Sequence, residues 1–291
     1  ENKEKLTAIL LLHVLPPAVF SAKHITGSHN ACVYEMTFLD QVKAVAPDQQ
    51  AFIIVYGAGG GSLDASTAAV KLSAVGYTNV QVFEGGIAGW EASGLTIDGT
   101  KMLPHEPPLN GTFVVNIDES LIRWTGRNLF NQHHGTVRLA DGQIVLTDGD
   151  LTAACFSIDM KSIACEDLAD PAMNGVLIRH LLDADFFDVS QYPTAGFTAL
   201  SVTPIPVLHE GTPSYLLKGH ITLRGITRPL EVPMVVASSD GKRLTGQAQF
   251  ELDRTAFGSL YGSGRFFRFL GKHLVSDHVH LHVIIHADLQ K

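Results

Sequence analysis

A glycine-rich stretch and a single cysteine are the first features of the chain that could perform chemistry. The stretch reads GAGGGS and consists of Gly57, Ala58, Gly59, Gly60, Gly61 and Ser62. Its backbone N–H groups, together with the start of a following helix, could surround an anion. Cys32 is the only thiol in the first hundred residues and could act as a redox or transfer thiol. A loop that only turns the chain and a buried, unreactive cysteine are the alternatives.

A row of histidines near the end of the chain is a candidate for metal binding. His278, His280 and His282 alternate along one predicted strand, and imidazole is a common zinc ligand. Side chains two residues apart on a strand are separated by roughly 6.5–7 Å, so three of them rarely converge on one ion. The valine and leucine between them indicate that the histidines face solvent. We therefore expect a surface row and no metal site.

The first hundred residues alternate short β-rich runs with helical patterns. Strands are expected at residues 10–14, 51–56 and 79–83, and helices at 38–45, at 62–74 and before Trp90. The run AFIIVY at 51–56 is typical of a central parallel strand that is covered on both faces. This order predicts an α/β domain with a parallel sheet and right-handed crossovers. Cys32 would lie near the carboxyl edge of that sheet, where the sites of α/β proteins gather.

The second half of the chain alternates apolar and polar residues with a period of two. This pattern, with turn signals such as Asp141-Gly142 and Asp240-Gly241, predicts an antiparallel barrel or sandwich interrupted by one helix around residues 174–182. Strand parity directs a set of apolar side chains inward, namely Trp124, Phe156, Ile158, Phe197, Phe250, Leu281 and Val283. Phe186 and Phe187, beside the helix, are expected to form or plug one end. Parity does not distinguish a hollow lumen from a packed one.

Length, composition and charge exclude several classes of protein. The 291 residues, at roughly 150 per domain, suggest two domains. The stretch 98–111 contains three prolines and no periodicity, so we predict a linker there, between a domain at 1–97 and a barrel at 112–291. A net charge of −8 disfavours nucleic-acid partners. No apolar run is long enough for a membrane helix, so an integral membrane protein is not expected.

Smaller signals bear on location, cofactors and arginines. Three cysteines cannot all pair and the visible start lacks a signal peptide, so we expect a cytoplasmic location, or a periplasmic one if a signal was removed from a longer precursor. Ser62 replaces the last glycine of a dinucleotide-binding pattern, so no nicotinamide cofactor is expected. Arginines near predicted turns or strand ends could form surface ion pairs or meet a diphosphate headgroup, and these are Arg179, Arg224, Arg228 and Arg254.

The first half resembles a rhodanese domain. The matching segments are LLHV, HITGSHNA, IIVY with its glycine loop, and AAVKLSAVGYTNVQVFEGGIAGW, which together cover most of residues 6–97. In that family a cysteine follows the central strand and carries a persulfide. Gly57 stands at this position, and His13 and Leu15 replace the usual Asp and Arg of the first strand's motif. The resemblance implies a rhodanese-like fold that is inactive as a thiosulfate sulfurtransferase.

The second half resembles the YceI family of polyisoprenoid-binding proteins over nearly its whole length. The segments that carry this resemblance are HHGTVRL, LTAACFSIDMKSI, RHLLDADFFDVSQYPTAGF, KGHITLRGITRPL, and LDRTAFGSLYGSG followed by VSDHVHLHV. The resemblance implies an elongated antiparallel barrel of lipocalin-like shape. It also implies that the lumen holds a long isoprenoid or quinone-like lipid, with no other cofactor.

Three functions are therefore open. The main hypothesis is a lipid carrier whose degenerate rhodanese module docks a protein partner or regulates the barrel. A divergent sulfur or thiol transferase acting through Cys32 is the enzymatic alternative. A protein-interaction module with a packed barrel is the third.

Overall fold

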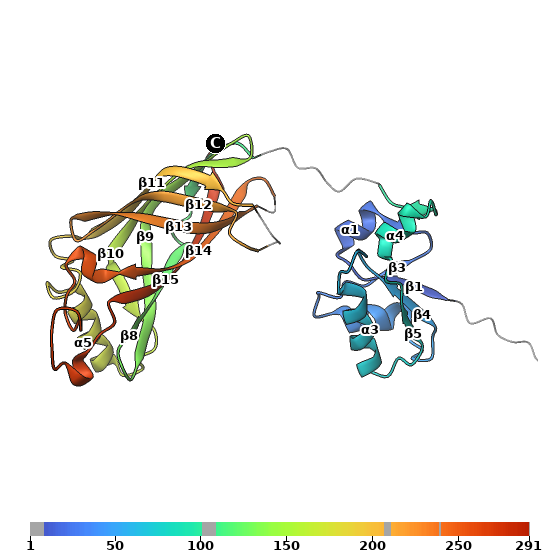
Figure 1. Ribbon diagram of the computed structural model, residues 1–291, viewed down its shortest axis with the longest axis horizontal. Coiled ribbons are helices and arrows are strands. Elements are labelled where there is room, and N and C mark those ends of the chain that lie inside the picture. Colours follow the sequence, from blue (N-terminus) through green and yellow to red (C-terminus); the bar gives the residue numbers. More distant parts are fainter. Residues whose placement is uncertain (1–8, 101–108, 207–210, 239, 291) are drawn as a thin grey trace, which may run out of the picture. The chain divides into compact units, whose positions relative to one another are not determined.

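The computed structural model describes residues 9–100, 109–206, 211–238 and 240–290. The chain divides into two compact units, residues 1–106 and 107–291, and each has its own hydrophobic core (Figure 1). The predicted linker at 98–111 spans this division, and its residues 101–108 lie outside the described residues. Within the described ranges, no helix has the length and apolar character needed to cross a membrane.

The first unit is built on a parallel four-stranded sheet. In spatial order its strands are β3 (His29–Asn30), β1 (Leu10–His13), β4 (Ile53–Tyr56) and β5 (Val80–Val82). All three pairings are parallel, which confirms the predicted α/β architecture. The helices are α1 (Pro17–Ala22), α2 (Phe38–Val45), α3 (Asp64–Ala74) and α4 (Gly86–Ala92). An antiparallel pair of β2 (His24–Ile25) with β6 (Ile97–Asp98) extends the ordered structure of this unit to Asp98.

The second unit is a closed antiparallel β-barrel, as predicted. Its strands are β8 (Leu121–Arg127), β9 (Gln132–Thr147), β10 (Asp150–Cys165), β11 (Thr194–Pro204), β12 (Tyr215–Leu223), β13 (Ile226–Ala237), β14 (Arg243–Asp253) and β15 (His278–Leu289). Each pairs with the next along the chain, and β15 returns to pair with β8. Because the sheet closes on itself, these strands leave no free edge.

A short strand, β7 (Gly111–Val115), shares the position of β8 in the barrel. Both lie between β15 and β9, with β7 against residues 287–289 and β8 against residues 280–284 of β15. The interruption between them is held by the buried Ser120. Its hydroxyl donates to the His286 carbonyl at 3.1 Å and accepts the His286 N–H at 2.8 Å. Two consecutive segments thus complete one strand position.

One end of the barrel carries a helix and two loops. The helix α5 (Pro171–Leu182) begins where the Asp170 carboxylate accepts the N–H of Ala172 at 2.9 Å (Figure 1). The segment 254–277, which contains the 3₁₀ turns η1 (Arg254–Phe257) and η2 (Gly271–His273), lies against this helix, because the rings of His180 and Tyr261 are 4.4 Å apart. It also meets the β8–β9 turn, through a bridge between Asn128 and Val275. We call this the α5 end.

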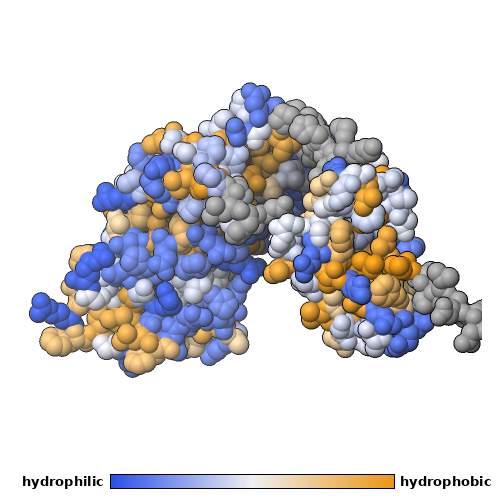
Figure 2. Space-filling view, turned by 45° about the vertical axis from the view of Figure 1, so that its right-hand side comes forward, coloured by the Kyte–Doolittle hydropathy of each residue, from blue (hydrophilic) through white to orange (hydrophobic). Residues whose placement is uncertain are grey.

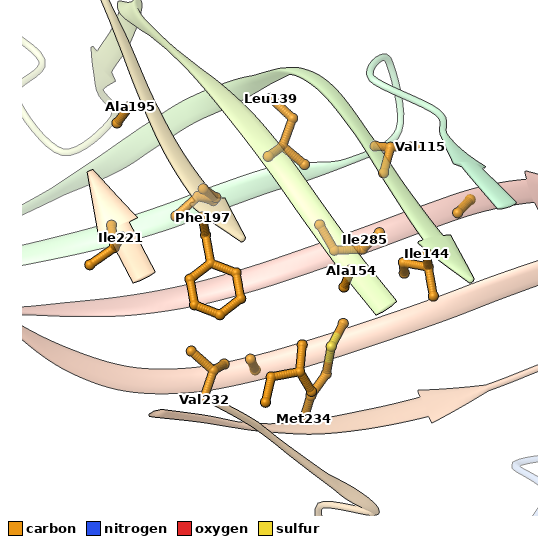
Figure 3. Close-up of a cluster of buried hydrophobic side chains, with 14 of the residues drawn as sticks. Val115, Leu139, Ile144, Ala154, Ala195, Phe197, Ile221, Val232, Met234 and Ile285 are labelled. Atoms are coloured by element: carbon orange, nitrogen blue, oxygen red, sulfur yellow. The ribbon is translucent and has the colours of Figure 1, made fainter. Parts of the chain in front are cut away.

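The opposite half of the barrel is filled by side chains. Figure 3 shows apolar residues of several strands meeting inside it, among them Ile144, Met234 and Ile285. Ile144 of β9 and Ile285 of β15 have no exposed surface. This packed half supplies the stable core on which the α5 end is built.

Arg254 fixes the segment 254–277 from inside. It is 1% exposed, so it does not form the surface ion pair considered from the sequence. Its guanidinium donates to the carbonyl oxygens of Ser259 at 2.6 Å, Ser276 at 2.9 Å and Val275 at 3.1 Å. It also lies 4.0 Å from Asp277. Replacing this side chain leaves three carbonyls without their donor and removes a cation from beside Asp277.

We therefore expect Arg254→Met to destabilise the barrel by about 3 kcal/mol, because a buried charge pair is broken on one side only. Urea unfolding followed by Trp124 fluorescence, in a Trp90→Phe background, measures this change. The exposed Arg228→Met is the matched control and should change the free energy of unfolding by less than about 0.5 kcal/mol. Equal stability of Arg254→Met and the parent would contradict this account of the segment.

Candidate functional site

A cavity of about 330 Å³ lies inside the barrel at the α5 end. Strands β8, β10, β12 and β15 form its walls, and α5 and the segment 254–277 cover it. Most of its lining is apolar and includes Ile122, Met160, Ile163, Leu177, Leu181, Leu223 and Val279. Its volume is in the range of small-molecule binding sites.

A second space of about 70 Å³ continues toward the packed half. Every residue that lines it is apolar. It shares Ile122, Ile158, Ile221 and Leu281 with the larger cavity, so the two spaces adjoin. The lumen is therefore neither fully hollow nor fully packed. It is open at the α5 end, narrows in the middle and is filled at the other end.

The residues predicted from strand parity, and the two phenylalanines beside the helix, lie along these spaces. Trp124, Phe186 and Phe187 line the larger cavity, Phe156, Phe197, Phe250 and Val283 line the smaller one, and Ile158 and Leu281 line both. The ring of Phe186 lies 5.5 Å from that of Tyr261. Their position is thus known, while their contact with a ligand stays a prediction.

Polar side chains mark the place where the larger cavity reaches the surface. Arg127, Lys272 and His273 line it and are also exposed, and Asn128 beside them is half-buried. We call this opening the mouth. Strand parity could not find these residues, because Arg127 is the last residue of β8 and the others lie in turns and loops. The run RFFRFLGKH at 265–273 was the available signal, since it places aromatic and basic residues together.

A hydrogen bond between His133 and Asp167 stabilises the wall next to the mouth. His133 of β9 lines the larger cavity, and its Nδ1 is 2.9 Å from Oδ2 of Asp167. Burial raises the pKa of Asp167, but the hydrogen bonds from the His134 N–H and from His133 outweigh it and hold the pKa below its usual range. The carboxylate therefore stays charged and joins the start of β9 to the segment after β10.

The glycine stretch of the first unit is occupied by a carboxylate of the same chain. Asp64, the first residue of α3, is 4% exposed. It accepts hydrogen bonds from the Ala58 N–H at 3.1 Å, the Ala65 N–H at 2.6 Å and the Ser62 hydroxyl at 2.7 Å. A Cβ placed on Gly57 would collide with this carboxylate. Asp64 thus engages one backbone N–H and the Ser62 hydroxyl of the loop, and while its carboxylate lies there a side chain at position 57 has no room.

His13, at the end of β1, is buried next to this loop. It has no exposed surface, and its Nε2 has no hydrogen-bond partner among the described residues. The pKa of His13 is lowered to about 4, chiefly by burial and also by the neighbouring His24, whereas Asp64 acts to raise it. The imidazole is therefore neutral near pH 7.

Cys32 and the histidine row are not assembled into sites. Cys32 follows β3 but is only 2% exposed, and its backbone N–H donates to Gln41. His278 and His280 are exposed on β15, and His282 contacts Gln247 at 3.4 Å. In the part of the chain that the structure describes, no three His, Cys, Asp or Glu side chains are grouped to hold a metal ion.

Comparison with protein families and curated proteins assigns both halves of the chain. A YceI-like domain model matches residues 113–287, and a Rhodanese-like domain model matches residues 1–93. A UPF0312 protein of Pseudomonas putida strain W619 is 28% identical over 97 residues, which is 33% of this chain and 45% of the relative. A UPF0312 protein of Pseudomonas putida strain F1 matches to the same extent. The chain thus spans about 45% of the length of these curated relatives.

Solved structures similar to each half are also known. BcnA of Burkholderia cenocepacia is 22% identical with a TM-score of 0.48, over 60% of this chain and 99% of that one. A polyisoprenoid binding domain from Saccharophagus degradans is 11% identical with a TM-score of 0.44, over 62% and 99%. A thiosulfate sulfurtransferase from Pseudomonas aeruginosa is 27% identical with a TM-score of 0.29, over 31% and 17%.

The occupied loop generates a prediction about Gly57 and Asp64. We expect Gly57→Cys to destabilise the first unit by about 2 kcal/mol, because its Cβ and the Asp64 carboxylate compete for one space. Asp64→Ala should also destabilise, since three donors lose their acceptor. The double variant should lose at least about 1 kcal/mol less stability than the sum of the losses in the two single variants, because removing the carboxylate makes room for the thiol. Thermal unfolding of the four proteins measures the coupling, and additive effects would contradict the arrangement.

The buried imidazole generates a second prediction. The pKa of His13 is about 4 in the folded state, against the ordinary value of 6.5 that applies to the unfolded chain. As the pH falls from about 7 to about 5, the unfolded chain therefore binds a proton at this imidazole that the folded chain does not bind. The first unit should therefore lose about 2 kcal/mol between roughly pH 7 and pH 5 relative to a His13→Leu variant. Hydrogen exchange of peptides from residues 10–98 measures this loss. The exposed His29→Leu is the control and should retain the pH dependence of the parent.

Proposed function

Because the chain belongs to the YceI-like family through residues 113–287 and carries a rhodanese-like domain before it, we propose that its barrel binds a lipid with a long apolar tail. The lipid class that fits is an isoprenoid or a quinone with an isoprenoid tail. The tail would lie in the larger cavity and enter the smaller one, with the polar end at the mouth.

The pair of adjoining spaces is the observation that carries this proposal. A polar substrate would find no partner in the smaller space, which is lined by apolar residues alone. An apolar chain gains roughly 25 cal/mol for each Å² of its surface that leaves water, so binding needs no chemical step. Ile122, Ile158 and Leu281 offer such contacts where the two spaces adjoin.

The narrowing of the lumen sets how a tail would be accommodated. Phe156, Phe197 and Phe250 surround the smaller space. A tail that passes beyond the larger cavity must displace or pack against these rings. Aromatic rings at this point would therefore act as a stop that limits the length of chain held inside the barrel.

We further propose that the rhodanese-like unit serves as a docking or regulatory module. It has no nucleophile at Gly57, and Asp64 fills the loop where an anionic group would be held. A thiol transferase acting through Cys32 has less support, because that residue is buried and would have to be uncovered before it could react. A purely structural barrel is disfavoured by the open cavity.

Quenching of Trp124 by a quinone tests the proposal, because this indole lines the cavity. The chain in a Trp90→Phe background should lose fluorescence saturably when a quinone with a long isoprenoid tail is added. Val283→Phe is used to fill the smaller space, because Val283→Trp would add a second fluorescent indole to the signal. Its added bulk should weaken binding about tenfold by narrowing the smaller space. Phe156→Asp should weaken it more, because a carboxylate in an apolar space loses its hydration.

Val114→Phe is the matched control, since Val114 is exposed on the outer face of β7. It should bind as the parent does. Circular dichroism establishes that each variant is folded. Absence of saturable quenching in the parent, together with no lipid in organic extracts of the purified protein, would disprove the lipid-binding function.

A further inference from the structure

The mouth of the cavity is surrounded by exposed aromatic and basic side chains. We propose that this rim docks on the surface of a bilayer that contains anionic phospholipids. The inference deepens the proposed function and rests on it, because it names where the lipid enters and leaves the barrel.

The apolar part of the rim comes from two loops. In the segment 254–277, Phe269 is fully exposed, and Phe266 and Phe267 are about half-exposed. In the turn between β8 and β9, Leu129 and Phe130 are also exposed. Exposed phenylalanines cost free energy in water, and a group of them at one place marks an interaction surface. Hydrophobic surface is visible at the lower part of the barrel in Figure 2.

The two loops are held together at the mouth. Asn128 bridges Val275, and the N–H of Ser276 donates to the carbonyl of Arg127 at 2.8 Å. The same loops supply Arg127, Asn128, Lys272 and His273 to the lining of the larger cavity. The exposed rings therefore flank the opening through which a ligand passes, and are not on a remote face of the barrel.

Phe269 combines full exposure with an unusual backbone conformation. Its φ is 60°, in the left-handed region that a phenylalanine rarely adopts. A residue in this conformation is expected where the surrounding structure or a function requires it. Here the strained residue is also the most exposed aromatic of the rim.

The charge of the rim selects an anionic surface as the partner. Residues 264–275 contain Arg265, Arg268 and Lys272 and no carboxylate, in a chain whose net charge is −8. Arg265 is engaged by Asp253 at 3.2 Å and Asp277 at 3.5 Å. Among the described residues, Arg268 and Lys272 have no carboxylate within 4.0 Å. These two cations remain available to phosphate groups.

The described part of the barrel begins at the end opposite the mouth. The carbonyl of Leu109 accepts the N–H of Gly149 at 3.0 Å. Gly149 follows the end of β9, whereas the mouth lies at the start of β9. Aromatic and basic side chains together are suited to the interface of a bilayer, where rings reach the acyl boundary and cations meet headgroups.

Co-sedimentation of the full chain with vesicles tests this inference. One set of vesicles is pure phosphatidylcholine, and the other contains three parts in ten of phosphatidylglycerol. The parent should bind the anionic vesicles, and binding should weaken as salt is added. Phe266→Ser with Phe269→Ser should reduce partitioning at least about tenfold. Arg268→Gln with Lys272→Gln should reduce it about tenfold on anionic vesicles, and little on neutral ones.

Leu200→Ser is the matched control, because Leu200 is exposed on β11 and does not line the mouth. It should bind vesicles as the parent does. Quinone binding in the absence of vesicles, read by Trp124 quenching, is measured on the same proteins and should be unchanged in the Phe266→Ser, Phe269→Ser variant, because neither residue lines the cavity. If the parent binds vesicles but the quinone does not quench its Trp124 fluorescence, the proposed function is wrong and the docking surface is still supported.

Three results would overturn the docking surface itself. The first is that the rim variants bind vesicles as well as the parent does, and the second is that the parent binds neither kind of vesicle. The third is a dimer, seen by light scattering, that becomes monomeric in the Phe266→Ser, Phe269→Ser variant. That outcome would assign the rim to contact between two copies of this chain.

Discussion

Closure of the barrel is the constraint on which the rest of the second unit depends. Once β15 pairs with β8, every strand has two neighbours, and side chains at alternate positions must point into one shared lumen. A slip of one residue in any pairing would turn that strand's apolar face to solvent. The division of one strand position between β7 and β8 is tolerated because Ser120 holds the gap with two hydrogen bonds to His286. The cavity exists only because this closed wall separates it from water.

The same constraint explains how much of the site could be predicted from the sequence. A period of two is a local property, so Phe156, Ile158, Leu281 and Val283 could be assigned to the lumen before any strand was paired. The bulge in β10 could not be predicted in this way. Between Asp159 and Ala164 the register shifts against β9, and Met160 and Ile163 both reach the cavity although they are three positions apart and would lie on opposite faces of a regular strand. The hollow itself was also unpredictable, because its volume depends on how α5 and the segment 254–277 fit over the barrel end.

The first unit shows a different limit of sequence reasoning. Gly57 indicated a lost nucleophile, and the parallel sheet followed from the order of strands and helices. The sequence did not predict that Asp64 occupies the loop, because an acidic residue in the first turn of a helix is common. In the fold its carboxylate satisfies donors of the loop and of its own helix. Asp64 therefore meets part of the hydrogen-bonding demand of the loop from within the chain.

The unequal ends of the barrel give the cavity a direction. Ile144 and Ile285 fill the far half, and the smaller space next to it accepts only apolar groups, so a bound molecule cannot place a polar end there. Arg127, Lys272 and His273 stand at the other end, where water and charge are available. An amphipathic molecule therefore has one favourable orientation, with the tail inward and the polar group at the mouth. Such a molecule enters the barrel tail-first and leaves it tail-last, and its tail stays out of water provided that the mouth lies against the membrane during the transfer.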